Sequence, residues 1–347
     1  MKKIILTTFK IFFYNFGIVF LFTIIIELLF GYWFDKNNLG PFMREHRMKN
    51  QKIIWEYKGE NIKYNYKRNY YGFRGEEVKL NEIKAIIMGG SVIDQRYTPD
   101  QYTITELLNK KLKSNEINLK IINGGAAEQG TKAIVSSFDN WFTKLKGFKP
   151  EIILIYVGIN DVLVENDSLE LMTQSHLLNP NKFESMIDNL KSRSFVYDKL
   201  RIFKYKYLEE KKNFTKYDGN ISKEYIDNFN FINFDSNYKL TENDKNLAKS
   251  FIKRIDLIFQ KSKKINAVPI FISNIGSTGF TSNITVLNLS LIDHCNLKKY
   301  YCIDLAKKLN GKKDFWYDGT HTSKEGSIEI VNIIFPELYK ILKSLNY

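Results

Sequence analysis

The stretch at residues 84–91 reads KAIIMGGS and decides the fold. Four apolar residues form a short continuous run, which two glycines and a serine bring to an end. A short apolar run bounded by turn residues is typical of a strand that is buried on both faces of a sheet. We therefore expect a buried strand here, with Ser91 in the turn that leaves its carboxyl end.

Four further runs of this kind stand at residues 119–122, 151–157, 267–273 and 300–305. Helical patterns lie between them, at about 102–114 and 131–145. A last helix begins near residue 323 and is expected to be kinked or broken before Pro336. Alternating strands and helices predict a parallel sheet covered by helices on both faces. The predicted fold class is α/β: a three-layer α/β/α sandwich with a flavodoxin-like parallel five-stranded sheet.

The amino-terminal 34 residues predict a transmembrane helix. Residues 11–34 read IFFYNFGIVFLFTIIIELLFGYWF, and Glu27 is the only charged residue among them. Such a run is long enough to cross a bilayer core of about 30 Å. No small-residue cleavage site follows it, which favours an uncleaved anchor over a signal peptide. Lysines and arginines stand on both sides, so the positive-inside rule gives no orientation.

The remaining chain divides into two predicted parts. Residues 35–80 are polar and aromatic without a clear period, and are interpreted as a juxtamembrane lead-in with short strands at most. Residues 81–347 form the main domain. A mainly helical insertion at about 165–238 interrupts it and is expected to cap the carboxyl edge of the sheet.

Composition excludes several classes of function. The formal charge is +14, but the lysines are scattered along the chain and no basic stripe or nucleic-acid-binding motif is present. We therefore expect a solvated basic surface and no nucleic-acid partner. Cys295 and Cys302 fit no metal pattern. They could form one bridge outside the cytoplasm, although two separate buried thiols are the more common case. No metal or organic cofactor is implied.

Four short motifs follow or adjoin predicted strands. Because the carboxyl ends of parallel strands meet at one edge of a sheet, all four can converge there. Each motif alone is a weak signal, whereas the ordered set is strong. The motifs are Gly89-Gly90-Ser91, Asn123-Gly124-Gly125, Gly158-Ile159-Asn160-Asp161 and Asp318-Gly319-Thr320-His321.

The motif residues include the parts of a nucleophile and its base. A serine hydroxyl needs an imidazole to accept its proton, and the imidazole needs a carboxylate on its other nitrogen. Only four histidines are present: His46 is near the predicted membrane helix, His176 is in the insertion, and His294 follows Asp293 on a predicted helix. His321 alone combines an acid three residues before it with a place near the sheet edge. His321 with Asp318 is therefore the candidate base for a nucleophile at this edge of the sheet.

The ordered motifs resemble those of the SGNH (GDSL-like) hydrolases, from about residue 85 to the C-terminus. The resemblance implies Ser91 as nucleophile, His321 as general base and Asp318 as its orienting acid. It implies an oxyanion hole made of the Ser91 and Gly125 backbone N–H groups and the Asn160 side-chain amide. Gly90 stands where the family usually has aspartate. Asp161 is expected to accept hydrogen bonds from loop amides. Arg74 could bind an anionic substrate group, but packing of a loop is the preferred interpretation. Trp316 and Tyr317 are expected to line a pocket or to pack in the core.

The resemblance implies a membrane-anchored serine esterase that acts through an acyl-Ser91 intermediate. The expected substrate is an ester-bearing small molecule, an acylated glycan or a lipid-linked saccharide, and the expected location of the domain is extracytoplasmic. Two alternatives remain open at this stage. An O-acyltransferase would use the same residues, and a non-catalytic envelope assembly or binding protein would carry a degenerate site.

Overall fold

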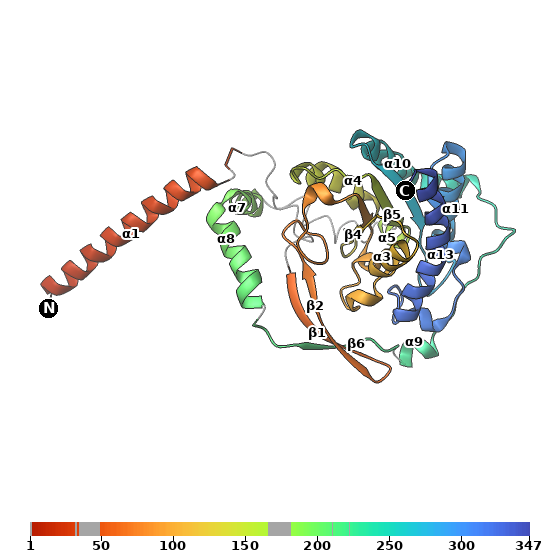
Figure 1. Cartoon of the computed structure of the whole chain (residues 1–347), viewed down its shortest axis with the longest axis horizontal. Helices are drawn as coiled ribbons and strands as arrows, with labels where there is room; N and C mark the ends of the chain where they lie inside the picture. The colour runs from red at the N-terminus through yellow and green to blue at the C-terminus, as the bar shows by residue number, and fades with distance from the viewer. Residues whose placement is uncertain (1, 32, 35–48, 166–181, 210, 222) are drawn as a thin grey trace.

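A long helix projects from the side of an α/β domain (Figure 1). The structure is a computed structural model and describes residues 2–31, 33–34, 49–165, 182–209, 211–221 and 223–347. Helix α1 spans Lys2–Phe30. Its segment Phe9–Phe30 is the one helix of the described residues that is long and apolar enough to cross a membrane, and its apolar side chains are exposed. By these criteria alone it could equally be a signal sequence.

The domain is built on a parallel five-stranded sheet, as predicted. Its strand order is β4-β3-β5-β7-β8, which is the flavodoxin-like order 2-1-3-4-5 when these strands are counted along the chain. Every neighbouring pair is parallel. The strands are β3 (Ala85–Met88), β4 (Ile121–Asn123), β5 (Ile152–Val157), β7 (Val268–Ser273) and β8 (Tyr301–Ile303).

Helices cover both faces of this sheet and make the predicted three layers. Alternate residues of each strand point to opposite faces, so Ala85 and Ile87 join one apolar cluster while Ile86 and Met88 join the other. This is why the strands read as continuous apolar runs. One face is covered by α3 (Ile104–Ser114) and α13 (Lys324–Ser344), the other by α4 (Thr131–Asn140), α10 (Glu242–Lys264) and α11 (Ser282–Lys298).

Shorter helical segments complete the domain. They are η2 (Leu80–Glu82), α2 (Ser91–Asp94), η3 (Asp100–Tyr102), η4 (Phe142–Lys144), α5 (Ile159–Glu165), α12 (Leu305–Lys308) and η6 (Lys313–Phe315). Of the kink or break predicted before Pro336, the break is wrong, because α13 continues through this residue. Proline removes one helix hydrogen bond. Burial of Ile334, Phe335 and Leu338 against the sheet offsets that loss.

The lead-in contains more structure than its sequence predicts. Strands β1 (Lys49–Tyr57) and β2 (Glu60–Arg68) form an antiparallel hairpin of nine residues each. Lys58 and Gly59 both have positive φ at the turn, as the favoured two-residue hairpin turns require. Alternate residues of β1 are buried while their neighbours are less so. Because β1 contains several polar residues, this alternation is hard to recognise in the sequence.

The insertion divides between two places. Helices α7 (Lys182–Arg193) and α8 (Phe195–Phe203) lie near the end of α1. The π-helix η5 (Lys204–Glu209) continues from α8 and lies beside β1. Strand β6 (Thr215–Asp218) instead pairs in parallel with β1, and α9 (Lys223–Asp227) follows it near the domain. The described helix α8 therefore contacts α1 and the lead-in, and a cap over the carboxyl edge of the sheet stays a prediction. Among the described residues of the insertion, Tyr217 of β6 and Tyr225 of α9 both approach the site, because Tyr217 meets Tyr317 and Tyr225 lies beside Ser277.

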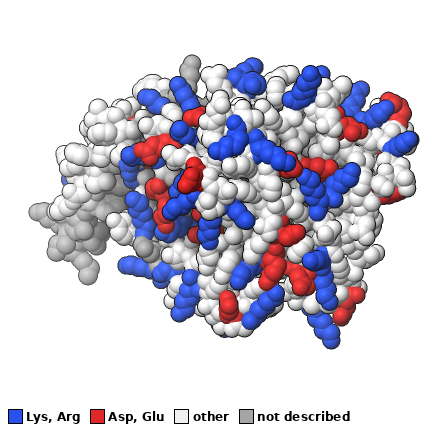
Figure 2. All heavy atoms as spheres, turned by 45° about the vertical axis from the view of Figure 1, so that its right-hand side comes forward, with Lys and Arg blue, Asp and Glu red and all other residues white. Residues whose placement is uncertain are grey.

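Two further predictions concern the cysteines and the surface charge. Cys295, near the end of α11, and Cys302 in β8 form a disulfide with Cα atoms 6.2 Å apart, so the bridged alternative is the one present. Figure 2 shows lysines and arginines interspersed with acidic residues over one face of the domain, without a basic stripe. That distribution fits a solvated basic surface.

Candidate active site

Ser91 begins α2 directly after β3 and the Gly89-Gly90 turn. Its Oγ lies 2.8 Å from Nε2 of His321. The other ring nitrogen, Nδ1, lies 2.7 Å from Oδ2 of Asp318. The structure thus brings the three predicted catalytic residues into one chain of hydrogen bonds, although 230 positions separate the serine from the histidine. All three side chains are partly exposed, so a ligand can reach them.

A local turn holds Asp318 in place. Its second oxygen, Oδ1, accepts the backbone N–H groups of Thr320 at 2.8 Å and His321 at 2.7 Å. Burial acts to raise the pKa of Asp318, but the hydrogen bonds from the His321 ring and the two N–H groups outweigh it and lower the pKa. The carboxylate is therefore ionised at neutral pH. An ionised acceptor at Nδ1 keeps the ring proton there and leaves Nε2 free to accept the Ser91 proton.

Aromatic rings line one side of the histidine. The Tyr317 ring stacks on the His321 ring, with centroids 5.7 Å apart and planes 9° apart. Tyr217 of β6 meets Tyr317 edge to face at 6.3 Å and stacks on Tyr97 at 4.1 Å. Trp316 is fully buried in the core. Tyr317 is thus the member of the predicted pair that contacts His321. Sequence reasoning missed Tyr217, because no local signal connects β6 with Tyr317.

Asn160 lies against the backbone that precedes Ser91. Its Nδ2 donates a long hydrogen bond of 3.3 Å to the carbonyl of Gln129. A Cβ at Gly90 would collide with this same amide nitrogen. Glycine at position 90 therefore allows the Asn160 amide to approach. Within the described residues the Ser91 N–H donates to no protein acceptor.

Both backbone groups of Gly125 have hydrogen-bond partners in this structure. Its N–H donates to Oδ1 of Asn123 at 2.9 Å, and its carbonyl accepts a hydrogen bond from Arg68. A committed N–H cannot also stabilise an oxyanion. In this structure Gly125 supports the loop, and it could act as an oxyanion donor only if the bond to Asn123 opened.

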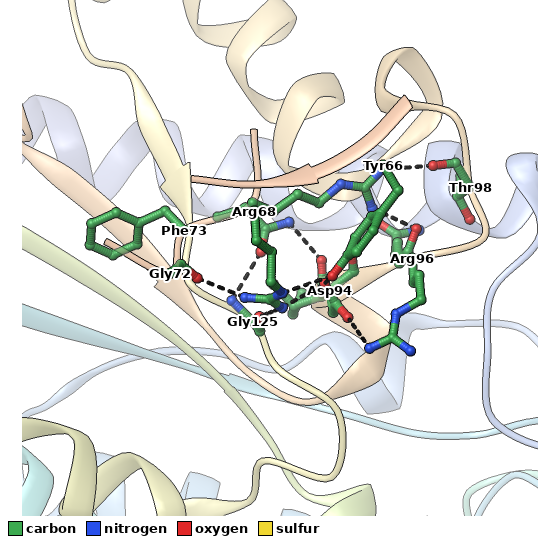
Figure 3. A network of polar contacts seen from close by, with 12 residues as sticks. Tyr66, Arg68, Gly72, Phe73, Asp94, Arg96, Thr98 and Gly125 are labelled. Carbon is green, nitrogen blue, oxygen red and sulfur yellow. Dashed lines mark hydrogen bonds and ion pairs between the residues drawn. The ribbon is translucent and has the colours of Figure 1, made fainter. Parts of the chain in front are cut away.

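A buried network anchors α2 to the lead-in hairpin (Figure 3). Arg68 is 1% exposed, and its Nη2 lies 2.6 Å from Oδ1 of Asp94 in α2. The Tyr66 hydroxyl donates to the same Oδ1 at 2.7 Å, and Nη1 of Arg68 donates to the Gly72 carbonyl at 2.7 Å. Because Arg68 also bonds Gly125, one guanidinium joins the Ser91 helix to the neighbouring loop. Local sequence gave no sign of this network.

Arg74 and Asp161 have the structural roles expected of them. Arg74 donates to the carbonyls of Gln95 at 2.5 Å and Thr98 at 2.7 Å, and so fixes the chain after α2. Asp161 is fully buried, and its Oδ1 accepts the backbone N–H of Thr131 at 2.8 Å. Burial raises the pKa of Asp161, against the opposing effect of the hydrogen bonds from Thr131.

The loop after β7 supports the loop that carries Asp318 and His321. Ser277 is 3% exposed, and both its N–H and its hydroxyl donate to the Gly319 carbonyl, at 3.2 and 3.0 Å. His46 and His176 lie outside the described residues. His294 pairs with Asp256, with Nε2 and Oδ1 2.7 Å apart. Among the residues that the structure describes, no cluster of histidine, cysteine and acidic side chains could hold a metal ion.

Comparison with known proteins finds likenesses in structure alone. TesA shares 10% identity, with a TM-score of 0.44, over 73% of this chain and 97% of TesA. The esterase EstA from Pseudoalteromonas sp. shares 14% identity, with a TM-score of 0.42, over 76% of this chain and all of EstA. A GDSL-like lipase from Bacteroides thetaiotaomicron shares 13% identity, with a TM-score of 0.40, over 77% of this chain and 92% of the lipase. No family model and no curated protein matches the sequence. Likenesses at this level do not identify the chemistry.

Proposed function

We propose that this chain is a serine esterase in which Ser91 is the nucleophile, His321 the general base and Asp318 the orienting acid. The observation that carries the proposal is the continuous hydrogen-bonded chain from Ser91 Oγ through the His321 ring to Asp318, with links of 2.8 and 2.7 Å. A serine activated in this way attacks ester carbonyl groups.

The reaction has two halves. Ser91 Oγ attacks the carbonyl carbon while its proton passes to Nε2 of His321. The tetrahedral intermediate then expels the alcohol, which takes that proton, and acyl-Ser91 remains. In the second half a water molecule gives a proton to His321 and its oxygen attacks the acyl carbon. The carboxylic acid leaves, and Ser91 recovers its proton.

The negative oxygen of the intermediate needs donors that are already in position. Asn160 Nδ2 and the Ser91 N–H are the proposed donors. Asn160 is supported by its place against Gly90, and the Ser91 N–H by the absence of an acceptor among the described residues. Gly125 would join them only after its N–H leaves Asn123.

The membrane part of the proposal rests on α1 and on the disulfide. We propose that α1 remains attached as an anchor and that the domain lies outside the cytoplasm. Disulfides persist in oxidising compartments, which agrees with the Cys295–Cys302 bridge. An acylated envelope glycan or a lipid-linked saccharide is the proposed substrate class, on the analogy of fold and location alone.

Covalent labelling of the full chain in detergent tests the proposal. A fluorophosphonate probe should modify Ser91, because the activated Oγ displaces fluoride from phosphorus. Ser91→Ala and His321→Ala should abolish labelling, whereas His294→Ala should label like wild type. Folded wild-type protein, verified by circular dichroism, that never labels would contradict the esterase and support a non-catalytic binding role.

Product analysis then separates hydrolysis from transfer. Wild-type enzyme that has not been treated with the probe would be given an acetyl ester, with and without an acceptor sugar. Free acetate in both reactions is expected of the esterase. Acetylated sugar as the main product, with little acetate when the sugar is absent, would favour the O-acyltransferase.

A further inference from the structure

Helices α7 and α8 and the π-helix η5 expose large apolar side chains at spacings that place them along one side of each helix. The α7–α8 face is defined here by six residues that are 48–67% exposed: Phe183, Met186, Leu190, Leu200, Phe203 and Tyr207. The spacing is i, i+3, i+7 within both groups of three. Soluble surfaces rarely carry so many large apolar side chains together, and such a patch marks an interaction site.

The start of α8 is fastened to the last turn of α1. The Glu27 carboxylate accepts the Ser194 hydroxyl at 2.6 Å and the backbone N–H groups of Phe195 and Val196, both at 3.0 Å. The Phe30 and Phe195 rings are 5.4 Å apart. Glu27 is the one charge of the apolar run, and here it caps a helix instead of facing lipid. These contacts therefore fix the position of the start of α8 along the α1 axis, at the carboxyl end of α1.

The direction of α8 agrees with a place at the membrane surface. Figure 1 shows α8 running across the direction of α1, on the side of the domain from which α1 projects. If α1 crosses a bilayer, α8 lies close to the bilayer plane and at the depth of Glu27. A helix with an apolar face in that position is the arrangement of interfacial membrane helices.

Charge and aromatic residues favour the same partner. Residues 182–212 contain nine lysines and arginines against five acidic residues. Among these, Lys191, Lys199 and Lys204 are exposed. Basic residues beside an apolar helix face attract anionic headgroups. Trp33 follows α1 closely and donates Nε1 to Glu27 at 3.2 Å, and tryptophan and tyrosine favour the headgroup level.

We propose that the α7–α8 face rests in the headgroup region of the same bilayer that α1 crosses. The domain is then held by two membrane elements, and its orientation over the lipid surface is fixed. This inference rests on the membrane anchoring proposed above and is independent of the esterase activity.

Site-directed fluorescence in vesicles tests the inference on the full chain. Leu200→Cys, Leu21→Cys and Ser344→Cys would each be labelled with the environment-sensitive dye NBD, without reductant, because the native cysteines are bridged. Leu21 lies within α1. Ser344 is exposed near the C-terminus, away from α1 in Figure 1. The vesicles contain phosphatidylcholine and phosphatidylglycerol, with nitroxide lipids as quenchers.

The expected order of depth is specific. The Leu21 label should be quenched by nitroxides deep in the acyl chains, the Leu200 label by nitroxides near the headgroups, and the Ser344 label by neither. A Leu200 label that behaves like the Ser344 label, while Leu21 is quenched, would overturn the inference and leave the anchor intact. Loss of quenching at Leu21 would overturn both.

Two further measurements test which partner covers the α7–α8 face. Removing phosphatidylglycerol should weaken quenching at Leu200 but not at Leu21, because only the α7–α8 segment depends on charge attraction. A Leu200 label that is already shielded in detergent, in protein that elutes as a dimer, would assign the face to a second copy of the chain and overturn the bilayer as its partner.

Discussion

Two histidine–aspartate pairs stand in different parts of this molecule and have the same nitrogen–oxygen distance of 2.7 Å. His321 and Asp318 lie at the carboxyl edge of the sheet, three residues apart in one turn. His294 and Asp256 join helices α11 and α10 on the outer face. His321 uses Nδ1 for its carboxylate, and its Nε2 reaches Ser91. His294 uses Nε2 for Asp256, which also accepts the Tyr300 hydroxyl at 3.0 Å.

The difference shows that a paired imidazole is not by itself a base for catalysis. What distinguishes His321 is the serine on its free nitrogen and the turn that fixes its carboxylate from two sides. The sheet provides both, because strands of distant sequence end at one edge. The outer pair has an acid and a ring but no nucleophile, and we assign it to packing between two helices.

Removing the nucleophile or the base should give the largest effect and separate the two pairs most sharply. Ser91→Ala or His321→Ala should lower ester turnover by about a million-fold, as the loss of either partner of such a pair does in serine proteases. His294→Ala should keep turnover close to wild type. Steady-state hydrolysis of a nitrophenyl acetate measures both. Equal losses in His321→Ala and His294→Ala would remove the distinction drawn here.

Replacing the carboxylates of the two pairs, Asp318 and Asp256, should give the second-largest difference in turnover. Asp318→Asn should lower turnover roughly ten-thousand-fold, because an amide at Nδ1 favours the wrong ring tautomer. Asp256→Asn should leave turnover nearly unchanged and affect only thermal stability. The same assay and a melting curve of each variant give the comparison. Asp318→Asn protein with wild-type turnover would assign the orienting role to another group.

The oxyanion donor should give a smaller loss. Asn160→Ala should lower turnover roughly a hundredfold or more, with little change in KM, because its amide is needed mainly in the transition state. Gly90→Ala should cause a similar loss, since the new Cβ displaces the Asn160 amide. The double variant should then lose no more than either single one. Losses that add would mean that Gly90 acts independently of Asn160.

The dependence of stability on pH should show the smallest effect. The pKa of Asp318 is lowered from 3.8 in the folded chain, so its charge stabilises the fold above about pH 3.8. That contribution should disappear as pH falls through the lowered pKa. The melting temperature of wild type should therefore exceed that of Asp318→Asn at neutral pH, and the gap should close in acid. A gap that widens in acid would reverse the assigned direction of the shift.

Sequence patterns predicted the features that depend on residues close together in the chain. The buried strands appear as apolar runs because both sheet faces are covered, and Asp318 and His321 appear together because one turn contains them. Ser91 could be placed beside them because parallel strands end at a common edge. The remaining features depend on contacts between distant segments, and no single window of sequence contains those.

Arg68, Tyr217 and Gly125 illustrate that limit. Arg68 looks like an ordinary charged residue of a polar strand until Asp94 is found beside it. Tyr217 reaches Tyr317, which stacks on His321, only because β6 pairs with β1. The spacing of Gly125 suggested a free N–H, but the side chain of Asn123 takes it. The nine-residue strands of the lead-in were underestimated for a related reason, since exposed lysines and glutamates dilute their apolar alternation.

The ion pair between Arg68 and Asp94 also determines the shortest amino-terminal truncation product that we expect to fold. A polypeptide that starts at residue 81 would lose Tyr66, Arg68 and Arg74 together. Of its described cationic partners, Asp94 would then keep Arg96, 4.0 Å away, and the side of α2 that the hairpin covers would be exposed to solvent. Trimming should therefore stop ahead of the hairpin, before Lys49, and a piece cut later is expected to unfold or aggregate.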